Sequence, residues 1–500
     1  MTGLRDLALR DARSWEDAAQ RFRVALPARY NIAADCLRAP AGDVALIEAD
    51  GERVTFGELD ALSARVAGGL RALGVGPGDR VAVQLSQGLD MAACVLAVLR
   101  LGAILVPVST VLGADGVAHR LADSEPRVVI GAAGVSPEQL QDGRAVGFAP
   151  TGPDTPAILL YTSGTTGKPK GILHGHRVLL GHHAIDFALD GIRPGDVSYG
   201  PVDWAWGGGL WLGLLVPLAH GIPVVAFRER RFDPERTVAL LRAHGVSVGL
   251  FPPTVLRLLR QSGVPLDGLR LRCLVTGAEA VEPDLLAWAA EELGVTVNNA
   301  YGQTEANALI GHSTLLGALD PSCLGRPYPG RRIALLDDDL QPVPQGSPGQ
   351  IAVAAGDPVC LLGYWNDPAR GPAGDWLLTG DTARADERGQ LFFAGRADDI
   401  IKSGAYRIGP AEVEAALLLD AAVAECAVVG LPDPARGQVV TAFVRLRGDA
   451  AGGAELTERL QQHVRAKVGG HAYPRDVRYV GDLPRTSTGK VDRATLRRAS

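Results

Sequence analysis

The chain has 500 residues, of which 47% are hydrophobic and 21% charged, and its 50 basic and 56 acidic residues give a net charge of −6. This length allows about two to four domains with large cores, and the ordinary composition excludes a disordered or collagen-like chain. The acidic balance argues against a protein that binds nucleic acid or coats a membrane, because both functions need a basic excess.

The cysteines and the N-terminus indicate the compartment. Six cysteines are scattered without metal-like spacing, which is typical of reduced core thiols. The N-terminus lacks the apolar segment that a secretory signal needs. The stretch over 204–227 is apolar enough to cross a bilayer, but its glycines and prolines favour a buried core segment that ends in a strand over 223–227. We therefore expect a cytoplasmic protein without a membrane span.

The predicted elements alternate between strands and helices along most of the chain. A hairpin is predicted around Asp50 and Gly51, between strands over 44–49 and 53–56. The predicted helices then cover 57–73, 89–100, 233–244 and 282–293, and the predicted strands cover 80–85, 127–130, 157–161, 246–251, 272–275 and 295–298. This alternation predicts an α/β protein with helix-covered, mostly parallel sheets.

The texture of the sequence changes after Gly325, where short strands are broken by turns. A final α/β unit follows Gly395, with predicted helices over 410–418 and 456–468 and strands over 423–429 and 439–446. We place a domain boundary near Asp398. The loops around it are short, so we expect a hinge there instead of a long linker.

The segment Tyr161–Gly171 carries the clearest chemical signal. Gly164 and Gly167, four hydroxyl side chains and two lysines follow a predicted core strand. Backbone N–H groups, hydroxyls and ammonium groups together suit a polyphosphate. The loop is not a Walker A motif, because only two residues separate Gly164 from Gly167. The plainer alternative is a solvated turn rich in small residues.

This segment resembles the signature of the adenylate-forming superfamily, which includes acyl-CoA synthetases, stand-alone adenylation domains and luciferases. Four later segments resemble further motifs of that superfamily in the same order: 301–305, 379–381, 395–409 and 484–490. The resemblance covers the chain from about Tyr30. Four of the five lysines, against forty-five arginines, fall inside these motifs.

The resemblance implies a two-domain fold. A large N-terminal domain, residues 1–397, would combine helix-covered, mostly parallel sheets with a small barrel-like part and bind acid, ATP and Mg²⁺. A small, mobile C-terminal α/β domain, residues 398–500, would carry the catalytic lysine and rotate about Asp398 between the two reaction steps.

The resemblance also implies the chemistry. A carboxylate attacks the α-phosphorus of ATP and expels pyrophosphate, and a thiol then displaces AMP from the acyl-adenylate. Lys490 would bridge the carboxylate and the α-phosphate, where a slim ammonium group neutralises both. Thr304 would grip the phosphates, Glu305 would hold Mg²⁺, and Lys402 would serve thioester formation.

Tyr301 would stack on adenine, and Asp381 with Arg396 would bind the ribose hydroxyls. The full set implied for ATP binding is Thr162, Ser163, Gly164, Thr165, Thr166, Gly167, Lys168, Gly277, Ala278, Glu279, Tyr301, Gly302, Gln303, Asp381, Arg396 and Arg407.

The acyl pocket is expected to consist of Asp203, Trp204, Trp206, Gly207, Phe251 and Gly302. Acetate-specific relatives carry a bulky tryptophan where Gly302 stands, so a chain longer than acetate is expected to fit. The apolar surroundings favour a medium-chain aliphatic or an aromatic monoacid over a diacid. Asp203 raises an amino-acid alternative, because a buried carboxylate could pair with an α-ammonium group.

The acceptor is expected to be coenzyme A, because the C-terminal segments look most like those of short- and medium-chain acyl-CoA synthetases. The CoA-binding residues would be Ala405, Tyr406, Arg465 and Lys467. Arg465 and Lys467 could equally be the solvated face of a helix. Ala405 departs from the glycine that the family commonly has there, so it could narrow the path of the thiol arm unless Gly404 takes that place.

Two alternatives remain at the level of sequence. A stand-alone adenylation enzyme would load an aromatic, fatty or amino acid onto a carrier protein. The absence of an appended carrier domain before Ser500 mildly favours free CoA. A non-catalytic nucleotide-binding relative would need a broken motif, which is not found. The sequence leaves a homodimer open.

Overall fold

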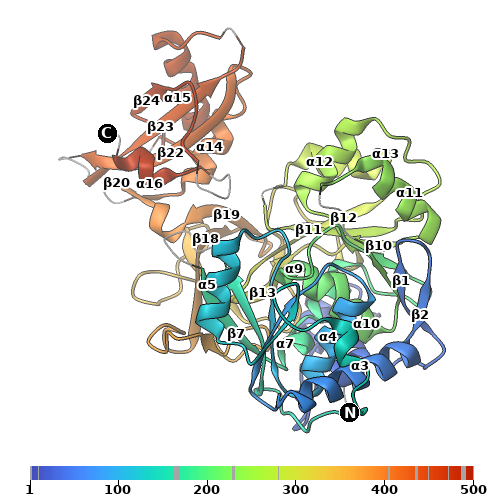
Figure 1. The fold of residues 1–500 in the computed structure, drawn as a ribbon. Helices are drawn as coiled ribbons and strands as arrows, with labels where there is room; N and C mark the ends of the chain where they lie inside the picture. The colour runs from blue at the N-terminus through green and yellow to red at the C-terminus, as the bar shows by residue number, and fades with distance from the viewer. Residues whose placement is uncertain are drawn as a thin grey trace. The chain divides into compact units, whose positions relative to one another are not determined.

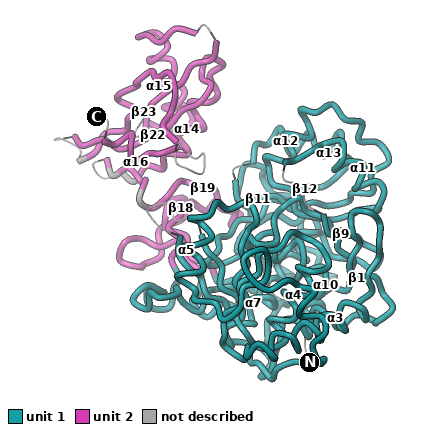
Figure 2. Tube along the Cα trace, viewed as in Figure 1, with its two compact units in different colours: residues 1–332, 354–377 teal, residues 333–353, 378–500 magenta. Residues whose placement is uncertain are grey.

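The computed structural model describes residues 3–9, 11–162, 169–227, 231–279, 281–403, 406–433, 437–448, 450–470, 472–485 and 491–498. These residues form two compact units, shown in different colours in Figure 2. The first unit contains residues 1–332 and 354–377, and the second contains residues 333–353 and 378–500. The boundary expected near Asp398 falls inside the second unit and stays a prediction.

A nine-stranded sheet is the largest element of the first unit. Its order is β14 (Arg326–Pro327), β13 (Ala306–Gly311), β12 (Thr296–Gln303), β11 (Cys273–Gly277), β10 (Val248–Leu250), β8 (Ser198–Tyr199), β9 (Val224–Ala226), β1 (Val44–Glu48) and β2 (Arg53–Thr55). The six strands from β12 to β1 pair in parallel, and β13, β14 and β2 add antiparallel edges.

A second, six-stranded sheet completes the first unit. Its order is β17 (Gly363–Tyr364), β7 (Lys170–Gly175), β6 (Pro156–Thr162), β4 (Ile104–Pro107), β3 (Arg80–Gln84) and β5 (Val128–Gly131). The strands from β6 to β5 are parallel, whereas β7 and β17 are antiparallel. Along β6, Ile158 and Leu160 enter one core and Leu159 and Tyr161 another, as the two-residue period of a strand requires.

Helices cover both faces of the large sheet. Helices α11 (Pro234–His244), α12 (Pro253–Ser262) and α13 (Pro283–Glu292) pack on one face around Leu274, beside β10–β12 in Figure 1. The core on the other face is shared with the six-stranded sheet. The remaining helices of this unit are η1 (Leu4–Leu7), α1 (Trp15–Arg21), α2 (Ile32–Cys36), α3 (Phe56–Ala72), α4 (Leu89–Arg100), α5 (Ala114–Ser124), α6 (Pro137–Leu140), α7 (Val178–Gly181), α8 (Ala184–Ala188), α9 (Gly207–Leu210), the π-helical η2 (Trp211–Leu215), α10 (Val216–His220) and η3 (Thr314–Leu316).

The second unit contains two small sheets. The first contains β15, β16, β18 and β19, and its pairs β15–β16 and β18–β19 are antiparallel. The second contains β20 to β24, with α14 and α15 on one face and α16 on the opposite face. The elements are β15 (Ile333–Leu336), β16 (Gly349–Ala354), β18 (Trp376–Ala385), β19 (Leu391–Arg396), η4 (Ala397–Asp399), β20 (Ile401–Ser403), β21 (Tyr406–Ile408), α14 (Pro410–Leu417), β22 (Val423–Asp433), β23 (Gly437–Leu446), α15 (Ala454–Lys467), β24 (Asp476–Tyr479) and α16 (Arg493–Arg498).

The α/β class and the parallel sheets predicted from the sequence are confirmed. Residues 204–227 fold into α9, η2, α10 and β9, most of them buried. Within the described part of the chain, no helix is long and apolar enough to cross a bilayer. All six cysteines are buried free thiols.

Candidate functional site

Two segments predicted to bind ATP lie at the carboxyl ends of neighbouring parallel strands. β11 ends at Gly277 and pairs there with Ala300 of β12, so Gly277–Glu279 and Tyr301–Gln303 lie along the same edge of the sheet. A Cβ at Gly277 would collide with the Ala300 carbonyl, which explains the glycine. The Glu279 carboxylate accepts hydrogen bonds from Thr254 Oγ1 at 2.8 and 3.0 Å. Ligands of open parallel sheets bind at such edges.

Strand β12 runs farther than the sequence predicts. It includes Tyr301, Gly302 and Gln303, because the strand turns tightly into β13 and Gln303 pairs with Ala306. A Cβ built on Gly302 would lie 2.5 Å from the Ala308 backbone nitrogen. In this conformation the close approach of β13 leaves no space for a Cβ at residue 302, so a side chain there would require the hairpin to shift.

Thr304 and Glu305 form the turn between β12 and β13, and several donors fix that turn. Asn307 Nδ2 donates to the Gln303 carbonyl at 2.7 Å, and the Leu361 amide donates to the Glu305 carbonyl at 2.9 Å. The Tyr364 hydroxyl donates to Glu305 Oε1 at 3.2 Å. Burial and the charge of Glu305 together raise the pKa of Tyr364, which keeps this hydroxyl a donor.

The hairpin that carries the predicted phosphate loop reaches the same turn. Thr162 ends β6 and pairs with Lys170 at the start of β7, and the loop residues Ser163, Gly164, Thr165, Thr166, Gly167 and Lys168 lie outside the described residues. His174 of β7 contacts the Thr304 carbonyl, with 2.8 Å between Nε2 and the oxygen. Tyr364 lies on β17, which pairs with β7. The fold thus brings the flanks of the loop to Thr304 and Glu305.

The predicted acyl-pocket residues differ in burial. Trp204 is 1% exposed and Phe251 0%, and both belong to hydrophobic cores, whereas Trp206 and Gly207 are half-buried. A Cβ built on Gly207 would lie 3.5 Å from Trp211 Nε1 and 3.6 Å from Leu160. Gly207 therefore leaves room over the buried Trp211 ring.

The Asp203 carboxylate is engaged inside the protein. Its Oδ2 accepts a hydrogen bond from the Ser109 hydroxyl, and its Oδ1 accepts one from the Ala205 amide at 2.9 Å. Asp203 is 6% exposed. These bonds give the carboxylate a local role, which is to fix the start of the 203–209 segment.

In the second unit, Asp381 and Arg396 lie opposite each other on β18 and β19. Arg396 Nη1 pairs with Asp381 Oδ1 at 2.8 Å. The predicted motif Thr379–Asp381 lies within β18, and Gly380 with φ +74° bends the strand there. Thr379 Oγ1 accepts a hydrogen bond from the Asp381 amide at 3.1 Å and donates one to the Ile351 carbonyl at 2.9 Å.

For several of the remaining predicted residues, the structure describes only the backbone or nothing at all. Asp398 lies in η4, and Lys402 of β20 pairs with Arg407 of β21, but their side chains are outside the described part, as is that of Tyr406. Ala405 and Lys490 are not described. Arg465 and Lys467 lie in the last turn of α15, and the Arg465 guanidinium lies 4.0 Å from the Tyr473 ring centroid.

The donors that hold the turn were not predicted from the sequence. His174, Asn307, Tyr364 and Leu361 lie outside the recognised motifs, up to 130 residues from their partners. The sequence offers one hint, which is that His174 follows the predicted phosphate loop by only six residues.

The carboxylate at the turn fits a magnesium ion that is shared with ATP. In the described residues, no group of three or more His, Cys, Asp or Glu side chains could hold a metal by itself. Mg²⁺ commonly uses one or two carboxylates together with substrate phosphates. A single half-buried carboxylate, Glu305, in a turn contacted by the strand that follows the predicted phosphate loop, matches that pattern.

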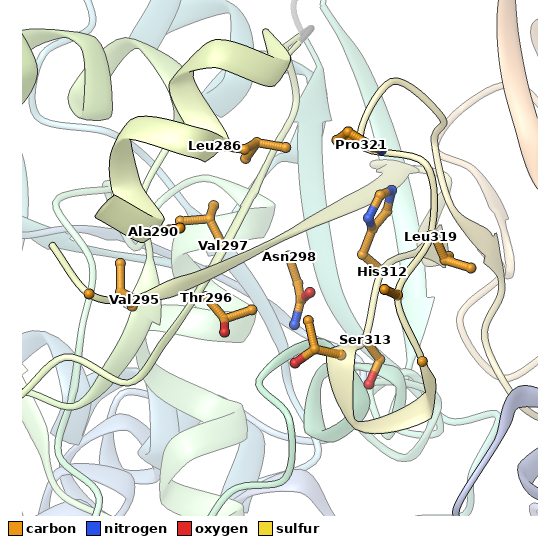
Figure 3. Close-up of a pocket in the computed structure, with 14 residues that line it drawn as sticks. Leu286, Ala290, Val295, Thr296, Val297, Asn298, His312, Ser313, Leu319 and Pro321 are labelled. Carbon is orange, nitrogen blue, oxygen red and sulfur yellow. The ribbon is translucent and has the colours of Figure 1, made fainter. Parts of the chain in front are cut away.

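A hollow of about 430 Å³ lies at the other end of β12, around Val295–Asn298. Figure 3 shows the aliphatic side chains of Leu286, Val295 and Val297 on one side and His312, Leu319 and Pro321 on the other. Tyr301–Glu305 do not line it. This hollow is therefore separate from the candidate site.

Comparisons with known proteins point to one family. The model of the AMP-binding enzyme family matches residues 33–365, and that of the AMP-binding enzyme C-terminal domain matches residues 412–490. The uncharacterized acyl-CoA ligase YtcI of Bacillus subtilis is 32% identical over 87% of this chain and 88% of its own length. The benzoate–CoA ligase of Thauera aromatica is 32% identical over 95% of this chain and 97% of its own length. The ATP-bound structure of MatB from Rhodopseudomonas palustris has a TM-score of 0.80 at 25% identity, over 94% of this chain and 99% of that one.

Proposed function

We infer that the substrate of this chain, which belongs to the AMP-binding enzyme family, is a medium-chain monocarboxylic acid. The protein is an acid–CoA ligase that uses ATP. The proposed reaction forms an acyl-adenylate and pyrophosphate, after which the CoA thiol takes the acyl group and releases AMP. The proposed location is the cytoplasm.

The hydrogen-bonded state of Asp203 is the observation that carries the choice of acid. Each carboxylate oxygen accepts a bond from the protein, so both oxygens have a partner without an α-ammonium group. The neighbouring side chains of Trp204, Trp206 and Trp211 are aromatic. An apolar monoacid fits such surroundings better than an amino acid or a diacid does.

For the first step, we assign protein residues to the anionic groups of ATP and of the acid. Glu305 would hold Mg²⁺, which supplies charge neutralisation when bound. Thr304 and the loop 162–168 would hold the phosphates, and Lys490 would hold the attacking carboxylate against the α-phosphate. Tyr301 and Gly277–Glu279 would contact the adenine.

For ribose and for the second step, the assigned residues lie in the second unit. Asp381 and Arg396, which form an ion pair, would bind the ribose hydroxyls. Lys402 and Arg407 would serve thioester formation after the part of the chain beyond Asp398 rotates, and Tyr406, Arg465 and Lys467 would contact CoA. The exposed cations of Arg465 and Lys467 suit a phosphate group.

The first test is AMP release with Mg²⁺, ATP and CoA across C2 to C12 fatty acids and benzoate, with Lys490→Ala as the inactive control. We expect a maximum between C4 and C10 that disappears in the variant. A maximum at acetate or at benzoate would overturn the medium-chain assignment. Benzoate belongs in the panel because a relative of this chain is a benzoate–CoA ligase.

The acceptor is tested in the same assay. Pyrophosphate exchange without CoA-dependent AMP release would mean that a carrier protein is the acceptor. Ala405→Gly would then show whether the alanine blocks the CoA arm. CoA-dependent release in the unchanged protein would support free CoA and make Ala405 compatible with it.

A further inference from the structure

One buried histidine contacts the turn at Thr304 and Glu305, alongside the bonds from Asn307, Leu361 and Tyr364. Among the described residues, Nε2 of His174 lies 2.8 Å from the Thr304 carbonyl oxygen. His174 is 0% exposed and lies on β7, the strand that follows the predicted phosphate loop. One side chain therefore links the strand after the loop to the turn that carries the proposed magnesium ligand.

The chemistry of the contact defines the state of the imidazole ring. A carbonyl oxygen only accepts, so Nε2 must carry the proton. Burial lowers the pKa of His174 to about 4, so the ring is neutral near pH 7 and Nδ1 carries no proton. The ring thus acts as a fixed donor.

Aromatic packing fixes the orientation of this ring. His174 meets Trp211 edge to face, with 6.1 Å between ring centroids, and His182 covers Trp211 at 4.7 Å. All three side chains are 0% exposed. A fully buried ring with such neighbours cannot rotate freely, so the direction of its N–H bond is defined before any substrate binds.

We propose that His174 is a positioning residue for adenylate formation, which it serves by holding the Thr304 carbonyl so that Thr304 and Glu305 face the phosphates of ATP. The proposal rests on the roles proposed above for Thr304 and Glu305. His174 touches no reacting atom in this assignment. It acts through the backbone of the turn.

The test compares two substitutions at His174. In His174→Phe the ring volume is kept and the donor is lost, so the turn can shift, and we expect kcat/KM for ATP to fall about 10- to 100-fold, because misplacements near 1 Å cost that much. The concentration of Mg²⁺ needed for half-maximal activity should rise in parallel. In His174→Gln an amide N–H can occupy the place of Nε2, so both quantities should return to within about threefold of the wild type.

His176 supplies the matched control. It lies two residues farther along, is also 0% exposed, and accepts a hydrogen bond from the Ile32 amide through Nδ1 at 3.1 Å. His176→Phe should lower the melting temperature without changing the dependence on ATP or Mg²⁺. The proposal is overturned if His174→Phe and His176→Phe have equal kinetic effects, or if His174→Gln is as defective as His174→Phe.

The outcome separates this proposal from the proposed function. If the wild type forms acyl-adenylate and pyrophosphate exchange responds to Glu305→Gln but not to His174→Phe, the function stands and the positioning role is wrong. If the wild type does not exchange pyrophosphate with any acid, the assignment of Glu305 and Thr304 fails first.

Discussion

The turn at Gln303–Glu305 and the segment Asp203–Gly209 are held in different ways. Three side chains, those of His174, Asn307 and Tyr364, and the Leu361 backbone amide donate hydrogen bonds to the turn. The 203–209 segment is held by Asp203, which accepts bonds from Ser109 and from the Ala205 amide, and by close contacts that leave no room for a side chain, such as that of Gly209 with the Asp203 carbonyl.

This difference has a functional meaning if the proposed assignment holds. Hydrogen bonds are directional, so the turn can hold atoms that act on every substrate molecule in the same way. Packed side chains and glycines set the size of a pocket, so the 203–209 segment can determine which acids fit. Changes in the turn should affect all acids equally, whereas changes in the segment should affect some acids more than others.

The largest expected effect comes from the turn. Glu305→Gln keeps an oxygen that can accept from Tyr364 but removes the negative charge. We expect kcat to fall about 10²- to 10³-fold with every acid tested, because the charge proposed to hold Mg²⁺ is lost. AMP release measures this, with Glu282→Gln, which breaks the ion pair with Arg257, as a control. Unequal losses among the acids would contradict the assignment.

A smaller, acid-dependent effect is expected from Gly207→Val. The new Cβ would lie 3.5 Å from Trp211 Nε1 and 3.6 Å from Leu160, and the two methyl groups on it would take up further space. We expect the ratio of kcat/KM between octanoate and butyrate to fall about 10- to 100-fold, because each methylene is worth roughly 1–3 kcal/mol in a shaped pocket. The KM for ATP should not change.

The control is Gly147→Val, where an added Cβ would meet no atom within 4 Å. Equal losses for octanoate and butyrate in Gly207→Val would show that this glycine supports the fold and does not set the acyl length.

Buried histidines join the two regions, and they should make stability depend on pH. Burial lowers the pKa of His174 to about 4 and those of His176, His182 and His183 to about 3, from 6.5. Below pH 6.5 the unfolded chain binds protons that the folded chain excludes. The free energy of unfolding therefore decreases as the pH is lowered from about 6.5 to about 3. At pH 5 each histidine should cost about 2 kcal/mol.

Urea denaturation at pH 7 and pH 5 measures this dependence. His182→Phe should make the loss of stability between these two pH values smaller by about 2 kcal/mol, since one buried group no longer titrates. Because His182 packs on Trp211 and His174 holds Thr304, acid should disturb both regions together. An unchanged difference between pH 7 and pH 5 in this variant would contradict the prediction.

Most elements could be predicted from the sequence because their apolar periods are clear. Helix α4 begins at Leu89 and ends at Arg100, as predicted, and it is almost entirely buried. The end of β12 was missed because Asn298, Asn299 and Gln303 interrupt its apolar pattern. Pairing with β11 and β13 overrides the low strand preference of such residues.

The candidate site could be predicted only in part. Recognisable motifs locate Thr304, Glu305 and Asp381, since each keeps a characteristic local pattern. His174 and Tyr364 could not be found in this way, because their roles depend on which strands pair: β17 joins β7, and β7 lies beside the turn. Contacts between residues 59 and 130 positions apart leave no local signal.

The smallest expected effect lies outside both regions. Arg465→Gln removes an exposed guanidinium that stacks on Tyr473, and we expect the KM for CoA to rise about threefold, the equivalent of about 0.7 kcal/mol, because exposed charge contacts contribute little. The KM for ATP and the order of preference among acids should stay unchanged, since adenylate formation precedes the use of CoA. Arg459→Gln is the matched variant on the same helix, because the Arg459 guanidinium is already paired with Asp420 at 2.7 Å. If both variants raise the KM for CoA equally, the general charge of α15 is responsible, and Arg465 makes no specific contact with CoA.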